Sequence, residues 1–162
     1  MKRLLITMIL MATLVSSVGL QAQEQDFDYD SYQPSSLPNI INDQKDTFFP
    51  NDQVVDHTID ANPSKYIINC IFTKDLREIN PNKIEFIQIW GKTLGHPEFA
   101  NLYKYEFQVR QGGKDYWIPI QDPLLPYMGN ELKIGQQFDL YIILAGTVKD
   151  EWVFLATEFS TK

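Results

Sequence analysis

The sequence predicts an all-β domain behind an N-terminal export signal and an acidic extended segment. The expected architecture is a small barrel of five or six strands or a compact sandwich. Three observations predict it: a run with strict two-residue alternation, a glycine-rich hairpin directly after that run, and further β-type runs separated by short turns. With 162 residues, of which 44% are apolar, the chain has the size of one globular domain with a modest tail.

The first 22 residues have the layout of a secretory signal peptide. Lys2 and Arg3 form a basic start, an apolar run follows from Leu4 to Val15, and small residues lead to Ala22. The apolar run is shorter than the roughly 20 residues that cross a bilayer as a helix. We therefore expect cleavage near Ala22 and a periplasmic or secreted bacterial protein without stable membrane insertion.

Residues 23–64 form an acidic, proline-containing segment. Lys45 is its single base against nine acids, and loss of the signal would change the net charge of the chain from −7 to −9. Because periodic apolar residues are absent before Val54, we expect residues 23 to about 48 to lack regular structure and to be flexible. The alternative is an extra strand at the domain edge, built around Phe48, Phe49, Val54 and Val55.

Residues 65–162 form the predicted β domain, and its clearest strand runs from Leu102 to Arg110. Along it, aromatic and apolar residues alternate with charged or polar ones, with Tyr103, Tyr105, Phe107 and Val109 on one face. Gly112 and Gly113 follow and supply the positive-φ residues of a tight hairpin turn. On the return strand, Tyr116, Ile118 and Ile120 share the inward face, so Trp117 should point outward.

Further strands are expected at Lys65–Lys74, Ile84–Thr93, Phe138–Val148 and Glu151–Phe159. The last two are separated only by Lys149 and Asp150 and should pair as a second hairpin. Between the hairpins, Asp122–Lys133 holds two prolines and fits a capping loop or one helical turn. The glycine turn at Lys133–Gly135 is a feature common in oligonucleotide-binding-type barrels, which makes a barrel of that kind one form of the expected fold.

Cys70 lies inside an apolar run and is expected to be a buried, unreactive core residue. A single cysteine also excludes an internal disulfide. The chain has neither a glycine-rich phosphate loop nor a dinucleotide fingerprint, and its negative charge disfavours nucleic acid. We expect no cofactor and no nucleic-acid partner.

The two histidines, His57 and His96, have no spacing typical of a zinc site or a hydrolase motif, so both are expected to be loop residues. The start of a calcium loop is imitated by Asp26, Asp28 and Asp30. Ser31 stands where that loop needs glycine, and Leu37 stands where it needs glutamate. No metal site is expected.

Aromatic residues make up 13% of the chain, and most should fill the core, Trp90 and Trp152 among them. Trp117 is the exception, because it should stand on the outer face near the hairpin turn. Together with Tyr116 and with Tyr127 of the following loop, it forms the candidate partner-binding set.

These features favour an exported, non-enzymatic binding or accessory module of the bacterial envelope, contacting a protein or glycan partner. A basic protein would suit the acidic charge. The alternative is a small periplasmic hydrolase that uses His57 or His96 with a carboxylate. A further alternative is an accessory subunit whose acidic segment folds on its partner.

Export is the first testable prediction. A chain expressed in a bacterial cell should lose residues 1 to about 22, because a basic start, an apolar run and a small-residue exit follow one another as in a secretory signal peptide. Intact mass measurement of the material outside the cytoplasm checks the cleavage site. A full-length chain starting at Met1 in the envelope fraction would contradict it.

Overall fold

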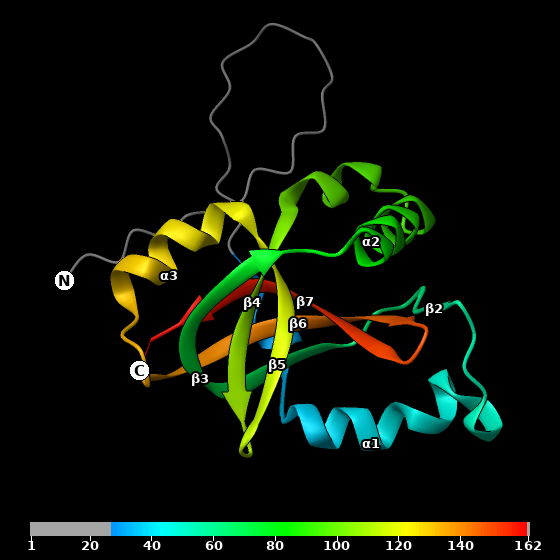
Figure 1. Cartoon of the computed structure of the whole chain (residues 1–162), viewed down its shortest axis with the longest axis horizontal. Helices are drawn as coiled ribbons and strands as arrows, with labels where there is room; N and C mark the ends of the chain where they lie inside the picture. The colour runs from blue at the N-terminus through cyan, green and yellow to red at the C-terminus, as the bar shows by residue number, and fades with distance from the viewer. Residues whose placement is uncertain (1–26, 162) are drawn as a thin grey trace, which may run out of the picture. The chain divides into compact units, whose positions relative to one another are not determined.

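The computed structural model describes residues 27–161 (Figure 1). The expected signal peptide and the first residues of the acidic segment lie outside this range. The chain separates into a unit ending at Ser31, where Tyr29–Ser31 (η1) forms one 3₁₀ turn, and a larger unit from Tyr32 onward. All further elements belong to the larger unit.

Five strands form a closed barrel in the order β3, β4, β5, β7, β6, with β6 pairing back onto β3. Neighbours are antiparallel except β5 and β7, which meet in parallel at Ile120 and Ala156. Two short strands are added outside, β1 on β3 and β2 on β6. The fold is therefore mostly β with a closed barrel, as predicted, and the sandwich alternative is wrong. The strands are β1 (Gln33–Ser35), β2 (His57–Ile59), β3 (Lys65–Glu78), β4 (Tyr103–Gln111), β5 (Lys114–Gln121), β6 (Gln137–Val148) and β7 (Glu151–Ser160).

Strand β3 closes the barrel because it is long and bent. Its first half pairs with β6 and its second half pairs with β4, with a register shift between Phe72 and Leu76. Lys74, inside that shift, has a φ of 72°. An irregularity of this kind bends a strand and re-aims its side chains. β1 pairs with the first half of β3 in parallel.

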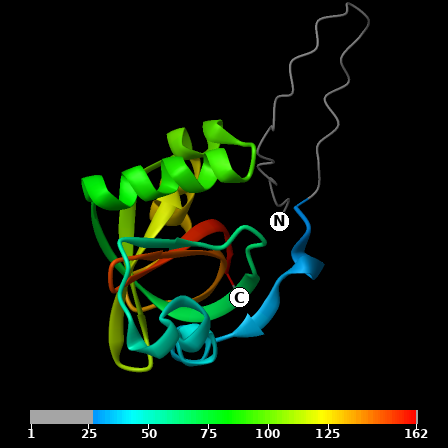
Figure 2. The same ribbon diagram turned by 90° about the vertical axis from the view of Figure 1, so that its right-hand side faces the viewer.

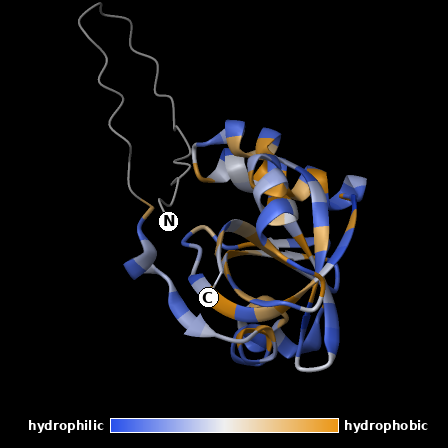
Figure 3. Ribbon diagram, turned by 90° about the vertical axis from the view of Figure 1, so that its left-hand side faces the viewer, coloured by the Kyte–Doolittle hydropathy of each residue, from blue (hydrophilic) through white to orange (hydrophobic). Residues whose placement is uncertain are grey.

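Both predicted hairpins are confirmed. Gly112 and Gly113 have φ angles of 59° and 76° at the β4–β5 turn, and Lys149 and Asp150 connect β6 to β7. Hydrophilic and hydrophobic residues alternate along the strands (Figure 3), and the inward positions of β5, Ile118 and Ile120, are fully buried. Local alternation therefore predicted these strands and the inward direction of Phe107, Val109, Ile118 and Ile120 correctly. The prediction is wrong for Tyr103, which lies beyond a register shift and packs with α2 outside the barrel.

The strand predicted at Ile84–Thr93 is wrong, because this segment belongs to helix α2 (Pro81–Thr93). Asn80 caps the helix by accepting a hydrogen bond from the Lys83 amide, and Pro81 occupies the first turn. Phe86, Ile87 and Trp90 are buried at helical spacing against the outside of the barrel. Apolar residues two apart, Ile84 with Phe86 and Ile87 with Ile89, imitated a strand, whereas the Asn-Pro start is a helix signal.

The structure also differs from the expectation that residues 23–48 lack regular structure. Residues 33–35 form β1, and helix α1 (Leu37–Phe48) follows, capped by Ser36. Phe48 and Phe49 are buried and pack edge-on against Trp152, so they dock on the domain, but at the end of helix α1 and not in the extra strand that the alternative supposed. The same alternative is wrong for Val54 and Val55, which are exposed in the loop between the short turn η2 (Pro50–Asp52) and β2.

The remaining elements are the 3₁₀ turns η3 (Pro97–Leu102) and η4 (Asp122–Leu124) and helix α3 (Leu125–Glu131). Side chains of α1 and α3 complete the core inside the barrel, whereas α2 packs on its outside. Figure 2 shows α2 and α1 on opposite sides of the barrel. Cys70 is buried, as predicted, and burial raises the pKa of its thiol. Within residues 27–161, no helix is long and apolar enough to span a membrane.

The packing of α1 is tested by Ile40→Ala. Ile40 is 2% exposed in the barrel core, so its truncation should cost about 2–5 kcal/mol of unfolding free energy. Asn42→Ala, on the exposed side of the same helix, is the control. Urea unfolding measures both variants, and an unchanged stability of Ile40→Ala would show that α1 does not pack as described.

Candidate functional site

Trp117 lies on the outer face of β5, opposite Gln108 of β4. The side chain is half-buried, because the guanidinium carbon of Arg77 lies 4.0 Å from the centre of its indole ring. Stacking of this kind is a favourable cation–π contact. The predicted outward direction is confirmed, but the ring is covered on one side rather than open.

Arg77 is held over the indole by the carboxylate of Glu106. Its Nε and Nη2 atoms donate to Oε1 of Glu106 at 2.7 and 2.6 Å. The side chain of Arg77 remains 49% exposed, so part of the guanidinium faces solvent. The cation is thus fixed by Glu106 and Trp117 and still accessible.

Glu106 itself has no exposed surface and is shared between two cations. Lys83, at the start of α2, donates to Oε2 of Glu106 at 2.8 Å and also lies 3.4 Å from Glu151 of β7. The Lys83 side chain is 4% exposed. Burying a carboxylate removes its hydration, and the hydrogen bonds from Lys83 and Arg77 compensate for that loss.

The position of Glu106 corrects the sequence prediction for β4. Alternation placed it correctly on the face away from the barrel interior, where a charged residue would normally meet water. The first turn of α2 covers it there through Lys83. The sequence predicts a strand at Ile84–Thr93, directly after Lys83, so it does not indicate this cluster, which depends on helix α2.

The outer face of β4 and β5 also holds an exposed ion pair. Arg110 donates to Asp115 through Nε at 2.7 Å and Nη2 at 3.2 Å. This contact holds the pKa of the Asp115 carboxyl below its usual value. Together, Arg77, Trp117, Arg110 and Asp115 form what we call the Trp117 face.

The other two predicted partner-binding residues lie elsewhere. Tyr116 precedes Trp117, and consecutive strand residues point to opposite faces. It packs against the barrel core, and burial raises the pKa of its hydroxyl. Tyr127 is exposed on α3, and among the ring contacts of residues 27–161 none joins it to Trp117. The structure therefore does not join the three predicted residues in one surface.

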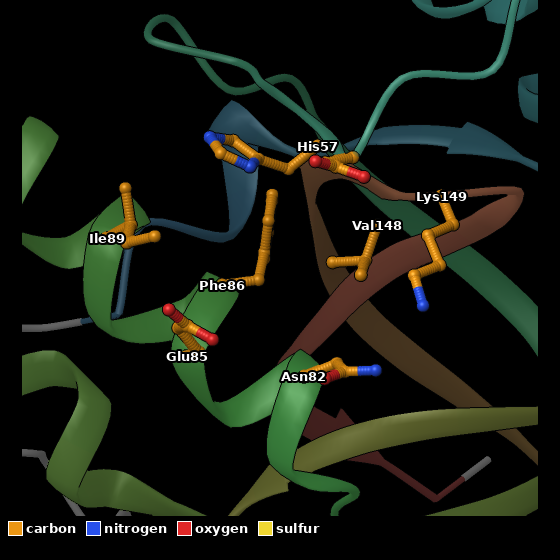
Figure 4. Close-up of a pocket in the computed structure, with 8 residues that line it drawn as sticks. His57, Asn82, Glu85, Phe86, Ile89, Val148 and Lys149 are labelled. Atoms are coloured by element: carbon orange, nitrogen blue, oxygen red, sulfur yellow. The ribbon is translucent and has the colours of Figure 1, made fainter.

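A cleft of about 310 Å³ lies between α2, β2 and the β6–β7 turn (Figure 4). Phe86, Ile89 and Val148 form its apolar part, and five polar residues surround it: Asp56, His57, Asn82, Glu85 and Lys149. Figure 4 shows the His57 ring on the side of Ile89 and Lys149 on the side of Asn82. The sequence did not indicate this cleft, because its walls come from three distant segments.

Gly146 of β6 allows those walls to approach. Its φ is 143°, and a Cβ atom there would collide with the Thr58 carbonyl oxygen of β2 and lie 2.9 Å from the Phe86 ring of α2. Only glycine permits both elements to pack this closely on β6. The cleft therefore depends on one backbone position.

The cleft brings His57 near the carboxylates of Asp56 and Glu85, yet within residues 27–161 no side chain hydrogen-bonds to its imidazole. His96 lies on the loop before η3, 3.2 Å from Glu98 and stacked on Phe99. His96 is a loop residue, as expected, whereas the same expectation is wrong for His57, which begins strand β2. In the described part of the chain, no group of three or more His, Cys, Asp or Glu residues is placed to hold a metal ion.

The buried cluster makes a stability prediction. Glu106→Gln would leave Lys83 and Arg77 without their anion, and breaking such a buried pair costs about 3–5 kcal/mol. Asp115→Asn removes an exposed pair and should change little. Urea unfolding measures the free energy of unfolding of both variants, and Glu106→Gln should lose much more of it than Asp115→Asn. Equal stabilities would show that the buried cluster contributes no more than a surface pair.

In comparisons with known proteins, no family model, no curated protein and no solved structure matches the chain.

Proposed function

We propose that this chain is an exported, non-enzymatic binding module of the bacterial envelope, and that it contacts a protein partner through the Trp117 face. The observation behind the proposal is the half-buried indole stacked under a guanidinium that a buried carboxylate holds. Interface hot spots are enriched in Trp and Arg. A pre-positioned pair also loses little side-chain entropy on binding.

The arrangement of strands supports the choice of this face. We assign the barrel to the oligonucleotide-binding type as part of the proposal, since β3 to β7 follow one another with a helix between the third and fourth strands. In such barrels, the face of the second and third strands is a binding surface, used for oligonucleotides and oligosaccharides. Those strands are β4 and β5 here, and Trp117 stands on them.

A protein is favoured over a glycan because Arg77 already covers one face of the Trp117 ring. A sugar that stacks on an aromatic ring needs an open ring face, whereas a protein can use the ring edge and the free side of the guanidinium. Nucleic acid is disfavoured, because the chain without its signal would carry a net charge of −9.

The second candidate is the small periplasmic hydrolase, with His57 acting beside Asp56 or Glu85 in the cleft, or His96 acting with Glu98. A general base needs to lie within hydrogen-bond reach of its substrate proton. His57→Ala and His96→Ala test this candidate. Loss of the cellular phenotype in either folded variant would favour it over the binding module.

Trp117→Ala tests the binding proposal. Affinity for the partner captured from envelope extract should fall by about 2 kcal/mol or more, about 30-fold, because the anchor is lost. Tyr127→Ala, an exposed aromatic outside the face, is the matched control and should bind normally. Calorimetry measures affinity, and circular dichroism checks folding.

Unchanged affinity of folded Trp117→Ala would remove this face from the interaction. A captured glycan in place of a protein would reverse the choice of partner class. If the partner is a basic protein, its association rate should fall as salt is raised, because acidic charge steers the encounter. A rate independent of salt would remove the electrostatic part of the proposal.

A further inference from the structure

The cleft beside α2 has a chemical character that the Trp117 face does not share. It combines an apolar part, from Phe86, Ile89 and Val148, with carboxylates of Asp56 and Glu85. Its volume of about 310 Å³ lies at the lower end of the range for ligand sites, about 300–1,000 Å³. A single long side chain fits this size better than a cofactor does.

The two carboxylates are free to accept a partner. Within residues 27–161, neither Asp56 nor Glu85 makes a side-chain hydrogen bond or an ion pair. Several other acids of the fold are engaged: Glu106 with Lys83 and Arg77, Asp115 with Arg110, and Asp52 with Lys45. Among the described residues, Asp56 and Glu85 therefore place two carboxylates without such partners in the lining of the cleft.

The loop that leads into the cleft exposes apolar side chains. Directly before Asp56, Val54 and Val55 are 58% and 49% exposed. Exposed apolar residues beside a recessed apolar surface are typical of an interaction site.

We infer that this cleft is a docking surface for a lysine or arginine side chain of a basic partner protein. The aliphatic stem of such a side chain packs on Phe86, Ile89 and Val148, and its cationic end meets Asp56 and Glu85. This occupant is favoured by charge complementarity between its cation and the carboxylates of Asp56 and Glu85. The inference does not depend on the Trp117 face, because it concerns a separate surface.

Lys149 is the group that opposes a cation, since it lines the same cleft without an ion pair in the described residues. Its side chain lies toward Asn82 (Figure 4), and its backbone amide donates to the Asp56 carbonyl. Removing its charge should therefore strengthen binding, whereas removing a carboxylate should weaken it. An anionic ligand would reverse both signs.

The test is a titration of the ¹⁵N-labelled chain with a capped tetra-arginine peptide at 0.15 M salt, with a tetraglutamate peptide as the control. Amide shifts should cluster at residues 54–57, 82–89 and 148–149. Glu85→Gln should weaken binding about threefold, and Lys149→Gln should strengthen it by a similar factor. Asp75→Asn, which removes one exposed charge on β3, and Trp117→Ala should leave it unchanged.

Three results would overturn the inference. One is the absence of clustered shifts at millimolar peptide. Another is a spread of amide shifts over all acidic surfaces, together with an equal loss of peptide affinity in Asp75→Asn and Glu85→Gln. That result would mean that the peptide is attracted unspecifically by negative charge. The third is binding of tetraglutamate that Lys149→Gln weakens. A failure of Trp117→Ala to affect the cellular partner would leave this result untouched, so the two proposals can fail separately.

Discussion

A carboxylate with no exposed surface, that of Glu106, imposes the main constraint on the outer side of this barrel. Its charge must be compensated where water cannot reach it, so Lys83 and Arg77 have to lie within hydrogen-bond distance. These contacts join the end of β3, the middle of β4 and the first turn of α2, and Lys83 extends them to Glu151 of β7. The position of α2 and the stacking of Arg77 on Trp117 therefore share one electrostatic cause.

The position of α2 in turn shapes the cleft. Lys83 ties the first turn of the helix to β4, and Gly146 allows Phe86 and the β2 backbone to approach β6 closely. The cleft and the Trp117 face thus lie on either side of one buried ionic contact. A partner bound in the cleft would contact helix α2. The first turn of this helix is joined through Lys83 and Glu106 to Arg77 of the Trp117 face. The two proposals concern separate sites that share this structural support.

Local signals predicted the hairpins well and the helices poorly. The β4–β5 turn needs two residues with positive φ, and consecutive glycines supply them wherever the rest of the chain lies. The segment around Ile84 and Phe86 has apolar residues that fit both periods, so alternation alone could not decide between strand and helix. In α1, only Leu37, Ile40 and Phe48 are buried, too sparse a pattern to stand out among acidic and polar neighbours. That helix is held by the barrel core and not by its own propensity.

The sequence by itself determined the β hairpins, the mostly β fold, the burial of Cys70 and the outward direction of Trp117, because each follows from the two-residue period of a strand or from a turn between adjacent strands. It left a barrel and a sandwich open, and the pairing of β6 with β3 decided for the closed barrel. The tertiary structure decided what covers each outward position. Arg77 lies over Trp117, Lys83 encloses Glu106, and three segments far apart in the chain form the cleft. Those contacts depend on how the barrel closes and where α2 packs on it, and no local pattern contains that information.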